Sequence, residues 1–149
     1  MLFRSAILAG AGQAETDKIY EFGDQLGMAF QLQDDFLDIY GDVNKFGKEI
    51  GGDIVTNKKT FLYLKAFGEA RGDNLVHLTS LFRANDLDDA TKVARIKEIY
   101  TSLGIDLMTR ELVERYLARA LECLAELNVP EERKRGLRQI AMEMLNREA

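Results

Sequence analysis

The sequence predicts an all-α protein organised as a helical bundle. Apolar residues recur at the spacing of a helix face along most of the chain, and no stretch alternates apolar and polar residues as a half-buried strand does. The loops between the periodic stretches beyond residue 60 are short. A chain of 149 residues has the length of one ordinary domain with a substantial core. We therefore expect residues 1–149 to form a single helical domain.

The first two predicted helices lie within residues 1–40. Apolar residues at helical spacing predict a helix over residues 1–11, which a Gly-Ala-Gly stretch ends. No capping residue precedes it, so we expect the chain to begin inside a longer helix. A second helix is predicted over residues 15–40, with Thr16 or Asp17 as its cap. At about 25 residues, it is the longest predicted element.

The helical period stops in residues 41–60. Glycine and lysine are frequent in this stretch, which predicts a mobile, basic loop. These residues are Gly41, Gly47, Gly51, Gly52, Lys45, Lys48, Lys58 and Lys59. Glycine and lysine are common in solvated surface loops, so this composition alone does not assign a function to the loop.

Five further helices are predicted beyond the loop. They are Phe61–Ala70, Asn74–Arg83, Asp88–Leu103, Ile105–Leu127 and Pro130–Arg147. Asp88 suits the N-cap of its helix, Gly104 ends that helix, and Pro130 suits the first position of the last helix. Apolar stripes along the last two helices predict that they pack against each other as antiparallel neighbours.

Composition argues against several classes of protein. The chain has 20 Lys and Arg against 25 Asp and Glu, a net charge of -5, which argues against a general nucleic-acid-binding surface. Its one cysteine, Cys123, excludes an internal disulfide. No stretch reaches the roughly 20 apolar residues that a membrane-spanning helix needs. No segment resembles a signal peptide, so we expect a cytoplasmic protein.

The long second helix carries acidic residues on one face and apolar residues on the other. The face that we call the acidic stripe follows from a rotation of about 100° per residue. It contains Gly23, Gly27, Gln31, Asp34 and Asp38, with Asp35 at its edge, and the opposite face contains Ala29, Leu32, Phe36 and Ile39. We expect the apolar face to pack and the acidic stripe to bind. Its glycines leave either a groove for a ligand or a close seat for another helix.

The acidic stripe is expected to bind a cation. Asp34 and Asp38 lie about 40° apart on the helix, and like charges at this spacing repel each other by roughly 0.2 to 0.5 kcal/mol. No His or Cys stands nearby, so the ligands are oxygen atoms, which suit Mg²⁺ better than Zn²⁺. Beside such an ion, the lysines and backbone amides of the loop over residues 41–60 would suit phosphate oxygens.

Other candidate sites have weaker support. Asp42 to Asp53 imitates a calcium-binding loop but has no ligand at the fifth position. His77 has no second ligand at metal-binding spacing and is interpreted as a surface or capping residue, and Cys123 as a small core residue. The aspartates within residues 86–89 are interpreted as helix caps or dipole partners, and the basic residues within 133–138 as a solvated helical face.

Two motifs in residues 30–60 point to a known family. Residues 30–38 read FQLQDDFLD, and the stretch that follows contains Gly47, Lys48, Gly51, Asp53, Lys58 and Thr60. They resemble the second aspartate-rich motif, FQxxDDxxD, and the GKxxGxD…KxT stretch of the trans-isoprenyl diphosphate synthases, also called polyprenyl synthetases. Lys59 is the alternative to Lys58 in this register. The resemblance runs along the whole chain and points to short-chain members, similar to farnesyl or geranylgeranyl diphosphate synthases.

The resemblance implies a fold, an activity and a set of site residues. The fold is the C-terminal half of the isoprenoid synthase fold. The activity is the Mg²⁺-assisted condensation of isopentenyl diphosphate with an allylic diphosphate, which releases diphosphate. The implied catalytic residues are Asp34, Asp35, Asp38 and Lys48, with the three aspartates as metal ligands. The implied substrate-binding residues are Phe30, Gln31, Lys48 and Lys58, with Arg147 as a weaker candidate.

The resemblance also implies that part of the active site lies elsewhere. The family carries an earlier aspartate-rich motif that this sequence lacks, so we expect a C-terminal fragment that is inactive alone. The residues that set product length in the family lie around that motif, so product length is not readable here. The family implies a homodimer, and we expect association to cover apolar faces that include Phe3, Ile7 and Phe22.

A different class of function is compatible with part of this pattern. In a non-catalytic helical interaction or oligomerisation module, the acidic stripe would pair with lysines of its own loop and the glycines would seat a partner helix. Such a module does not need Lys48 and Lys58 placed to reach phosphate, whereas a prenyltransferase does. A terpene cyclase usually has an Asn/Ser/Glu pattern at this motif, so the run from Asp34 to Asp38 argues against that class.

Overall fold

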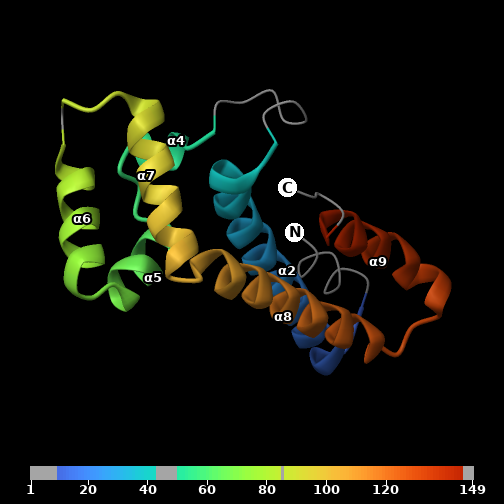
Figure 1. The fold of residues 1–149 in the computed structure, drawn as a ribbon. Helices are drawn as coiled ribbons and strands as arrows, with labels where there is room; N and C mark the ends of the chain where they lie inside the picture. Colours follow the sequence, from blue (N-terminus) through green and yellow to red (C-terminus); the bar gives the residue numbers. More distant parts are fainter. Residues whose placement is uncertain (1–9, 43–49, 85, 146–149) are drawn as a thin grey trace. The chain divides into compact units, whose positions relative to one another are not determined.

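The computed structural model describes residues 10–42, 50–84 and 86–145 (Figure 1). Within these ranges every regular element is a helix, which confirms the all-α prediction. The helices are α2 (Gln13–Tyr40), α4 (Gly52–Val55), α5 (Phe61–Glu69), α6 (Gly72–Arg83), α7 (Asp89–Ser102), α8 (Ile105–Ala125) and α9 (Glu131–Leu145). None of these described helices is long and apolar enough to cross a membrane. The helix predicted over residues 1–11 falls almost wholly outside the described residues.

Local signals explain where α5 and α7 begin and where α7 ends. The Asp88 carboxylate accepts a hydrogen bond from the Thr91 backbone N–H at 2.9 Å, so Asp88 is the predicted N-cap of α7. The Thr60 hydroxyl accepts one from the Tyr63 backbone N–H at 3.3 Å and caps α5. Gly104, with φ of 69°, follows α7 in a left-handed conformation that a residue with a side chain rarely adopts.

Two predictions about the first half of the chain are wrong. Helix α2 begins at Gln13, and the Thr16 hydroxyl donates to the Gly12 carbonyl at 2.9 Å from within the first turn, so neither Thr16 nor Asp17 is the cap. The predicted loop over residues 41–60 contains the short helix α4, which a periodicity argument cannot detect in four residues. The part of that loop over residues 43–49 falls outside the described residues.

Contacts divide the chain into two compact units. We call Leu32–Arg110 the central unit, and the residues up to Gln31 together with those from Glu111 onward the terminal unit. Helix α2 contributes residues to both units, those up to Gln31 to the terminal unit and those from Leu32 to the central unit. The single domain expected over residues 1–149 stays a prediction.

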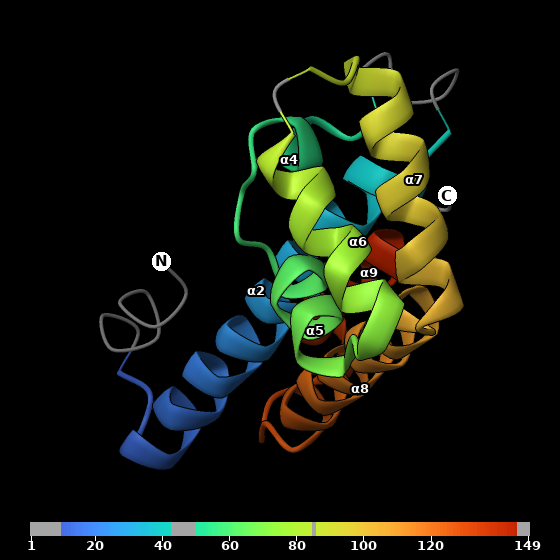
Figure 2. The same cartoon turned by 60° about the vertical axis from the view of Figure 1, so that its left-hand side comes forward.

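The central unit has a core built from α2, α4, α5, α6, α7 and the first residue of α8. Its buried residues are Ile39, Ile54, Leu62, Ala66, Ala70, Leu78, Leu81, Ile96, Tyr100 and Ile105. Helices α6 and α7 lie side by side in both views, and α7 also contacts α4 (Figure 2). Because Ile39 of α2 is buried in this core, the C-terminal part of α2 is anchored by its apolar face, as predicted.

The terminal unit has a smaller core on α2, α8 and α9. Its buried residues are Phe22, Ala120, Cys123, Leu124 and Leu127. Phe22 is 0% exposed, so the prediction that it belongs to an exposed apolar face is wrong, while the core assignment of Cys123 is confirmed. Lys134 is also buried, and its ammonium donates to the Ala125 carbonyl at 2.9 Å. The basic residues within 133–138 are therefore not all on a solvated face.

Candidate active site

The three aspartates of the acidic stripe differ in exposure. Asp34 is exposed, Asp38 is half-buried and Asp35 is buried. The opposite face of α2 packs into the protein, with Phe36 5% exposed and Ile39 1% exposed. The rotation of the helix thus places a carboxylate in solvent, one at the edge of the packed region and one inside it. The predicted division of α2 into a packing face and an acidic face is confirmed.

Helix α4 is held directly against the acidic stripe through its N-terminal end. The Gly51 backbone N–H donates to the Asp38 carbonyl at 2.6 Å, and the Asp53 backbone N–H donates to Asp38 Oδ2 at 2.9 Å. A Cβ on Gly52 would lie 3.5 Å from Asp38 Oδ1, so the Asp38 carboxylate lies close to the α4 backbone. The Asp38 side chain therefore joins α2 to the segment that carries Asp53.

Lys58 places its ammonium between two carboxylates. Lys58 Nζ lies 3.2 Å from Asp35 Oδ1 and 2.9 Å from Asp53 Oδ2. The Lys58 side chain is 56% exposed, whereas the Asp35 side chain is 9% exposed, so the ammonium covers a buried carboxylate from the solvent side. In the described part of the chain Lys59 makes no such ion pair, so Lys58 is the lysine that pairs with the aspartates.

Burial and pairing shift the pKa values of the charged groups in this cluster in opposite directions. Burial raises the pKa of Asp35 above its usual value, although the hydrogen bond and charge of Lys58 and the Phe61 backbone N–H act in the opposite direction. Burial also raises the pKa of Asp38, opposed by the Asp53 backbone N–H. The hydrogen bond with Asp53 raises the pKa of Lys58. Carboxylates held partly out of water beside a cation are typical of functional sites.

The donor atoms fit a hard cation only in part. Among the described residues, no three His, Cys, Asp or Glu side chains gather closely enough to hold a metal ion alone. The nearby ligands are carboxylate oxygens, which suit Mg²⁺, an ion that usually binds through one or two carboxylates and completes its shell with water and phosphate. These residues therefore fit Mg²⁺ as part of a larger ligand set.

The remaining predicted site residues lie one turn earlier on α2 or outside the described residues. Phe30 is 42% exposed on α2, and Gln31 beside it is also exposed. Lys48 and Arg147 fall outside the described residues. Asp53 was not among the predicted site residues, although the GKxxGxD register already contained it, because its contact with Lys58 depends on how α4 folds back onto α2.

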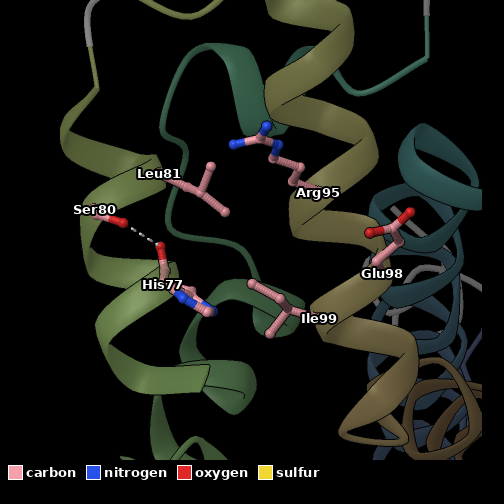
Figure 3. A pocket seen from close by; sticks show the side chains of 6 residues that line it. All are labelled: His77, Ser80, Leu81, Arg95, Glu98 and Ile99. Atoms are coloured by element: carbon pink, nitrogen blue, oxygen red, sulfur yellow. Dashed lines mark hydrogen bonds between the residues drawn. The ribbon is translucent and has the colours of Figure 1, made fainter. Parts of the chain in front are cut away.

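A separate pocket lies between α6 and α7 in the central unit (Figure 3). It has a volume of about 320 Å³ and is lined by His77, Ser80, Leu81, Arg95, Glu98 and Ile99. Leu81 and Ile99 point toward each other from the two helices, and the Ser80 hydroxyl donates to the His77 carbonyl at 2.9 Å. None of the predicted site residues that the structure describes lines this pocket. His77 is exposed, which confirms its assignment to the surface.

Comparison with known proteins connects the aspartate cluster to a family. A family model described as polyprenyl synthetase matches residues 3–103. The chain is 30% identical to the short chain isoprenyl diphosphate synthase of Methanothermobacter thermautotrophicus, over 96% of this chain and 43% of the relative. It is 34% identical to the geranylgeranyl diphosphate synthase of Saccharolobus solfataricus, over 87% of this chain and 40% of the relative.

Solved structures of geranylgeranyl pyrophosphate synthases resemble the fold of this chain. A crystal structure of a geranylgeranyl pyrophosphate synthase superposes with a TM-score of 0.83 at 36% identity, covering 97% of this chain and 45% of that chain. The geranylgeranyl pyrophosphate synthetase of Pyrococcus horikoshii superposes with a TM-score of 0.82 at 26% identity, covering 93% of this chain and 42% of that chain. The chain thus spans less than half the length of the relatives it matches.

Proposed function

Because this chain belongs to the polyprenyl synthetase family, we propose that it supplies the second aspartate-rich half of a prenyltransferase active site. The proposed reaction joins isopentenyl diphosphate to an allylic diphosphate. The bond between the allylic carbon and the diphosphate oxygen breaks, and its electron pair leaves with diphosphate. The π electrons of the isopentenyl double bond form the new carbon–carbon bond, and the departing diphosphate accepts the proton that is lost. The observation that carries the proposal is the cluster in which Lys58 joins Asp35 of the FQxxDDxxD motif to Asp53.

The residues of the cluster have distinct proposed roles. Asp34, Asp35 and Asp38 would hold Mg²⁺, which when bound neutralises charge on diphosphate oxygens. Lys58, with an exposed side chain, would donate charge-assisted hydrogen bonds to the diphosphate, and Lys48 would do the same. Such preorganised donors stabilise the charge that develops on a leaving group.

Two uncharged residues of α2 complete the proposed site. Phe30 and Gln31 precede the aspartates by one turn of the helix and are both exposed. We assign them to the binding of the isopentenyl group, Phe30 through apolar contact and Gln31 through its amide.

We further propose that the working enzyme is a homodimer. We also propose that this chain gives no turnover alone, because its sequence contains a single aspartate-rich motif of the family.

Prenyl transfer in a reconstituted mixture tests this function. Radiolabelled isopentenyl diphosphate and an allylic diphosphate are supplied with Mg²⁺ to this chain alone, and to this chain mixed with the part of the S. solfataricus relative that it does not match. We expect product only from the mixture, and none when the chain carries Asp34→Ala. The two parts of the relative, produced separately, are the control. Turnover by that control together with none by the mixture would contradict the proposal.

One observation favours a second candidate, a non-catalytic interaction module. Lys58 already pairs with Asp35 and Asp53, so the acidic stripe is partly neutralised by the chain itself. In such a module Lys58 would close the stripe permanently and no diphosphate would bind. The exposed Asp34 favours the prenyltransferase instead, because a carboxylate in solvent is available to a metal ion. Binding of pyrophosphate that needs Mg²⁺ separates the two candidates.

A further inference from the structure

Lys92 of α7 is a buried ammonium that binds the segment carrying Lys58. Lys92 is 5% exposed, and its Nζ donates to Asn57 Oδ1 at 2.9 Å. The same ammonium lies 5.8 Å from the centroid of the Phe82 ring. No carboxylate in the described part of the chain forms an ion pair with it. Burying a charge costs free energy unless the charged group is hydrogen-bonded. The hydrogen bond to the Asn57 amide oxygen therefore offsets part of the cost of burying the Lys92 ammonium.

Asn57 has an unusual backbone conformation directly before Lys58. Its φ is 55°, and it is the one residue other than glycine with a positive φ among those described. Asparagine tolerates this left-handed region better than most residues, but the conformation still needs support from its surroundings. The turn at Asn57 aims the next residue, Lys58, at Asp35 and Asp53. A bond that fixes Asn57 therefore fixes the direction in which Lys58 leaves the turn.

The residue after Lys92 contacts the other end of the same segment. Gly51 has φ of 86°, and a Cβ built on it would lie 2.5 Å from a methyl carbon of Val93. Lys92 and Val93 thus meet Asn57 and Gly51, the two residues that flank α4 and Thr56. Between these two contacts lies Asp53, whose backbone N–H donates to Asp38. Helix α7 therefore supports the segment from both ends.

We propose that Lys92 is a positioning residue for the diphosphate-binding cluster. It holds Asn57 in the left-handed turn, and through that turn it sets the position of Lys58 against Asp35 and Asp53. Lys92 itself is buried behind the segment and does not touch the substrate. The effect of Lys92 on diphosphate binding rests on the function proposed above. Its support of the turn at Asn57 does not depend on that function.

Hydrogen exchange of residues 50–60 tests the structural part. Lys92→Met keeps most of the side-chain volume and removes the donor, and Asn57→Gly keeps the positive φ and removes the acceptor. We expect each change to speed exchange of the α4 amides by about tenfold or more, as for a lost hydrogen bond to a charged group. The double variant should exchange no faster than either single variant, because both changes remove the same hydrogen bond. Lys97→Met is the control, because Lys97 lies on the same helix over the Tyr40 ring.

Calorimetry with inorganic pyrophosphate and Mg²⁺ tests the functional part on the same variants. We expect Lys92→Met and Asn57→Gly to weaken pyrophosphate binding by about tenfold or more, and Lys97→Met to change it less than about twofold. Unchanged exchange in residues 50–60 of both Lys92→Met and Asn57→Gly would overturn the inference. If exchange responds as expected but the unmodified chain binds no pyrophosphate, the positioning role is supported and the proposed function fails. Asn57 is exposed, so Asn57→Gly remains informative even if Lys92→Met does not fold.

Discussion

Asp34, Asp35 and Asp38 share one helix but contribute differently to stability. Burial raises the pKa values of Asp35 and Asp38, which means that keeping them ionised at neutral pH costs folding free energy. Lys58 offsets part of that cost at Asp35. Asp34 is exposed, and within the described ranges no ion pair or hydrogen bond of its side chain explains an acid at its position. Charges retained at a cost to stability are expected where a ligand uses them.

Asp34→Ala should separate binding from folding. Because Asp34 is exposed, we expect the free energy of unfolding to change by less than about 0.5 kcal/mol. Pyrophosphate binding in the presence of Mg²⁺ should weaken by about tenfold or more, as for a lost charged partner. The matched control is Asp24→Ala, an exposed aspartate on the same helix, which should change neither quantity. Loss of the helical circular dichroism signal in Asp34→Ala would instead make the acidic stripe structural.

Cys123 should be chemically silent until the terminal unit opens. It is 1% exposed, and burial together with the nearby Glu21 carboxylate raises the pKa of its thiol. The thiolate is the reactive form, so labelling by a thiol reagent at pH 8 should be slow in the folded chain and fast in urea. A pKa raised in the folded state contributes stability below the ordinary value of 9.0 that is lost as the pH rises through the folded value. Fast labelling of the native chain would contradict the core assignment.

At the scale of the elements, local signals were sufficient for most helices and insufficient for the contact that builds the site. The cap at Asp88 and the glycine at Gly104 are short-range features, so the sequence located both ends of α7 to within a residue or two. Helix α4 has four residues and is held by Asp38 and Val93, which are distant in sequence. The pairing of Lys58 with Asp35 and Asp53 was therefore not predictable from periodicity.

Thr60 should stabilise the start of α5, the helix that follows Lys58 in the chain. It is 6% exposed, and its hydroxyl accepts the Tyr63 backbone N–H. Thr60→Ala leaves that N–H without its cap and should lower the free energy of unfolding by about 1 kcal/mol. Thr60→Ser keeps the hydroxyl and should lose clearly less of this capping energy. Urea unfolding followed by circular dichroism measures the difference, and equal losses in the two variants would contradict a capping role.

Gly51→Ala should disturb the contact between α4 and α7. The positive φ of Gly51 costs an alanine about 1–2 kcal/mol, and its Cβ would also meet Val93 at 2.5 Å. We expect a loss of at least about 2 kcal/mol in urea unfolding. Gly52→Ala is the control, because its Cβ would lie 3.5 Å from the nearest atom, Asp38 Oδ1. Adding Val93→Ala to Gly51→Ala should recover only part of the loss, since the backbone strain remains.

At the scale of the whole molecule, the residues of the aspartate cluster all belong to one of the two compact units. Asp34, Asp35, Asp38, Asp53 and Lys58 belong to the central unit, whereas Phe30 and Gln31 belong to the terminal unit. The family motifs identified the aspartates of the acidic stripe and Lys58 as candidate site residues. The ion pairs of Lys58 with Asp35 and Asp53 could not be read from the sequence. The chain spans less than half the length of these relatives.

We expect copies of this chain to associate with one another. Several large apolar side chains are exposed within the described ranges, among them Val76 at 64%, Leu107 at 62% and Leu64 at 58%. Exposed apolar surface of this kind favours contact between copies. We expect light scattering of the purified chain to give a mass at least twice the 16.9 kDa of one copy. A single species at the mass of one copy over a range of concentrations would contradict the expected dimer.

The central claim is that α2, α4 and Lys58 form one half of a magnesium-diphosphate site. Calorimetric titration of the unmodified chain with inorganic pyrophosphate, with and without Mg²⁺, tests it most directly. The account predicts binding that requires Mg²⁺, weakens with rising salt and is lost in a variant carrying both Asp34→Ala and Lys58→Ala. Absence of binding in the presence of Mg²⁺, or binding that neither the omission of Mg²⁺ nor the double variant changes, would contradict it.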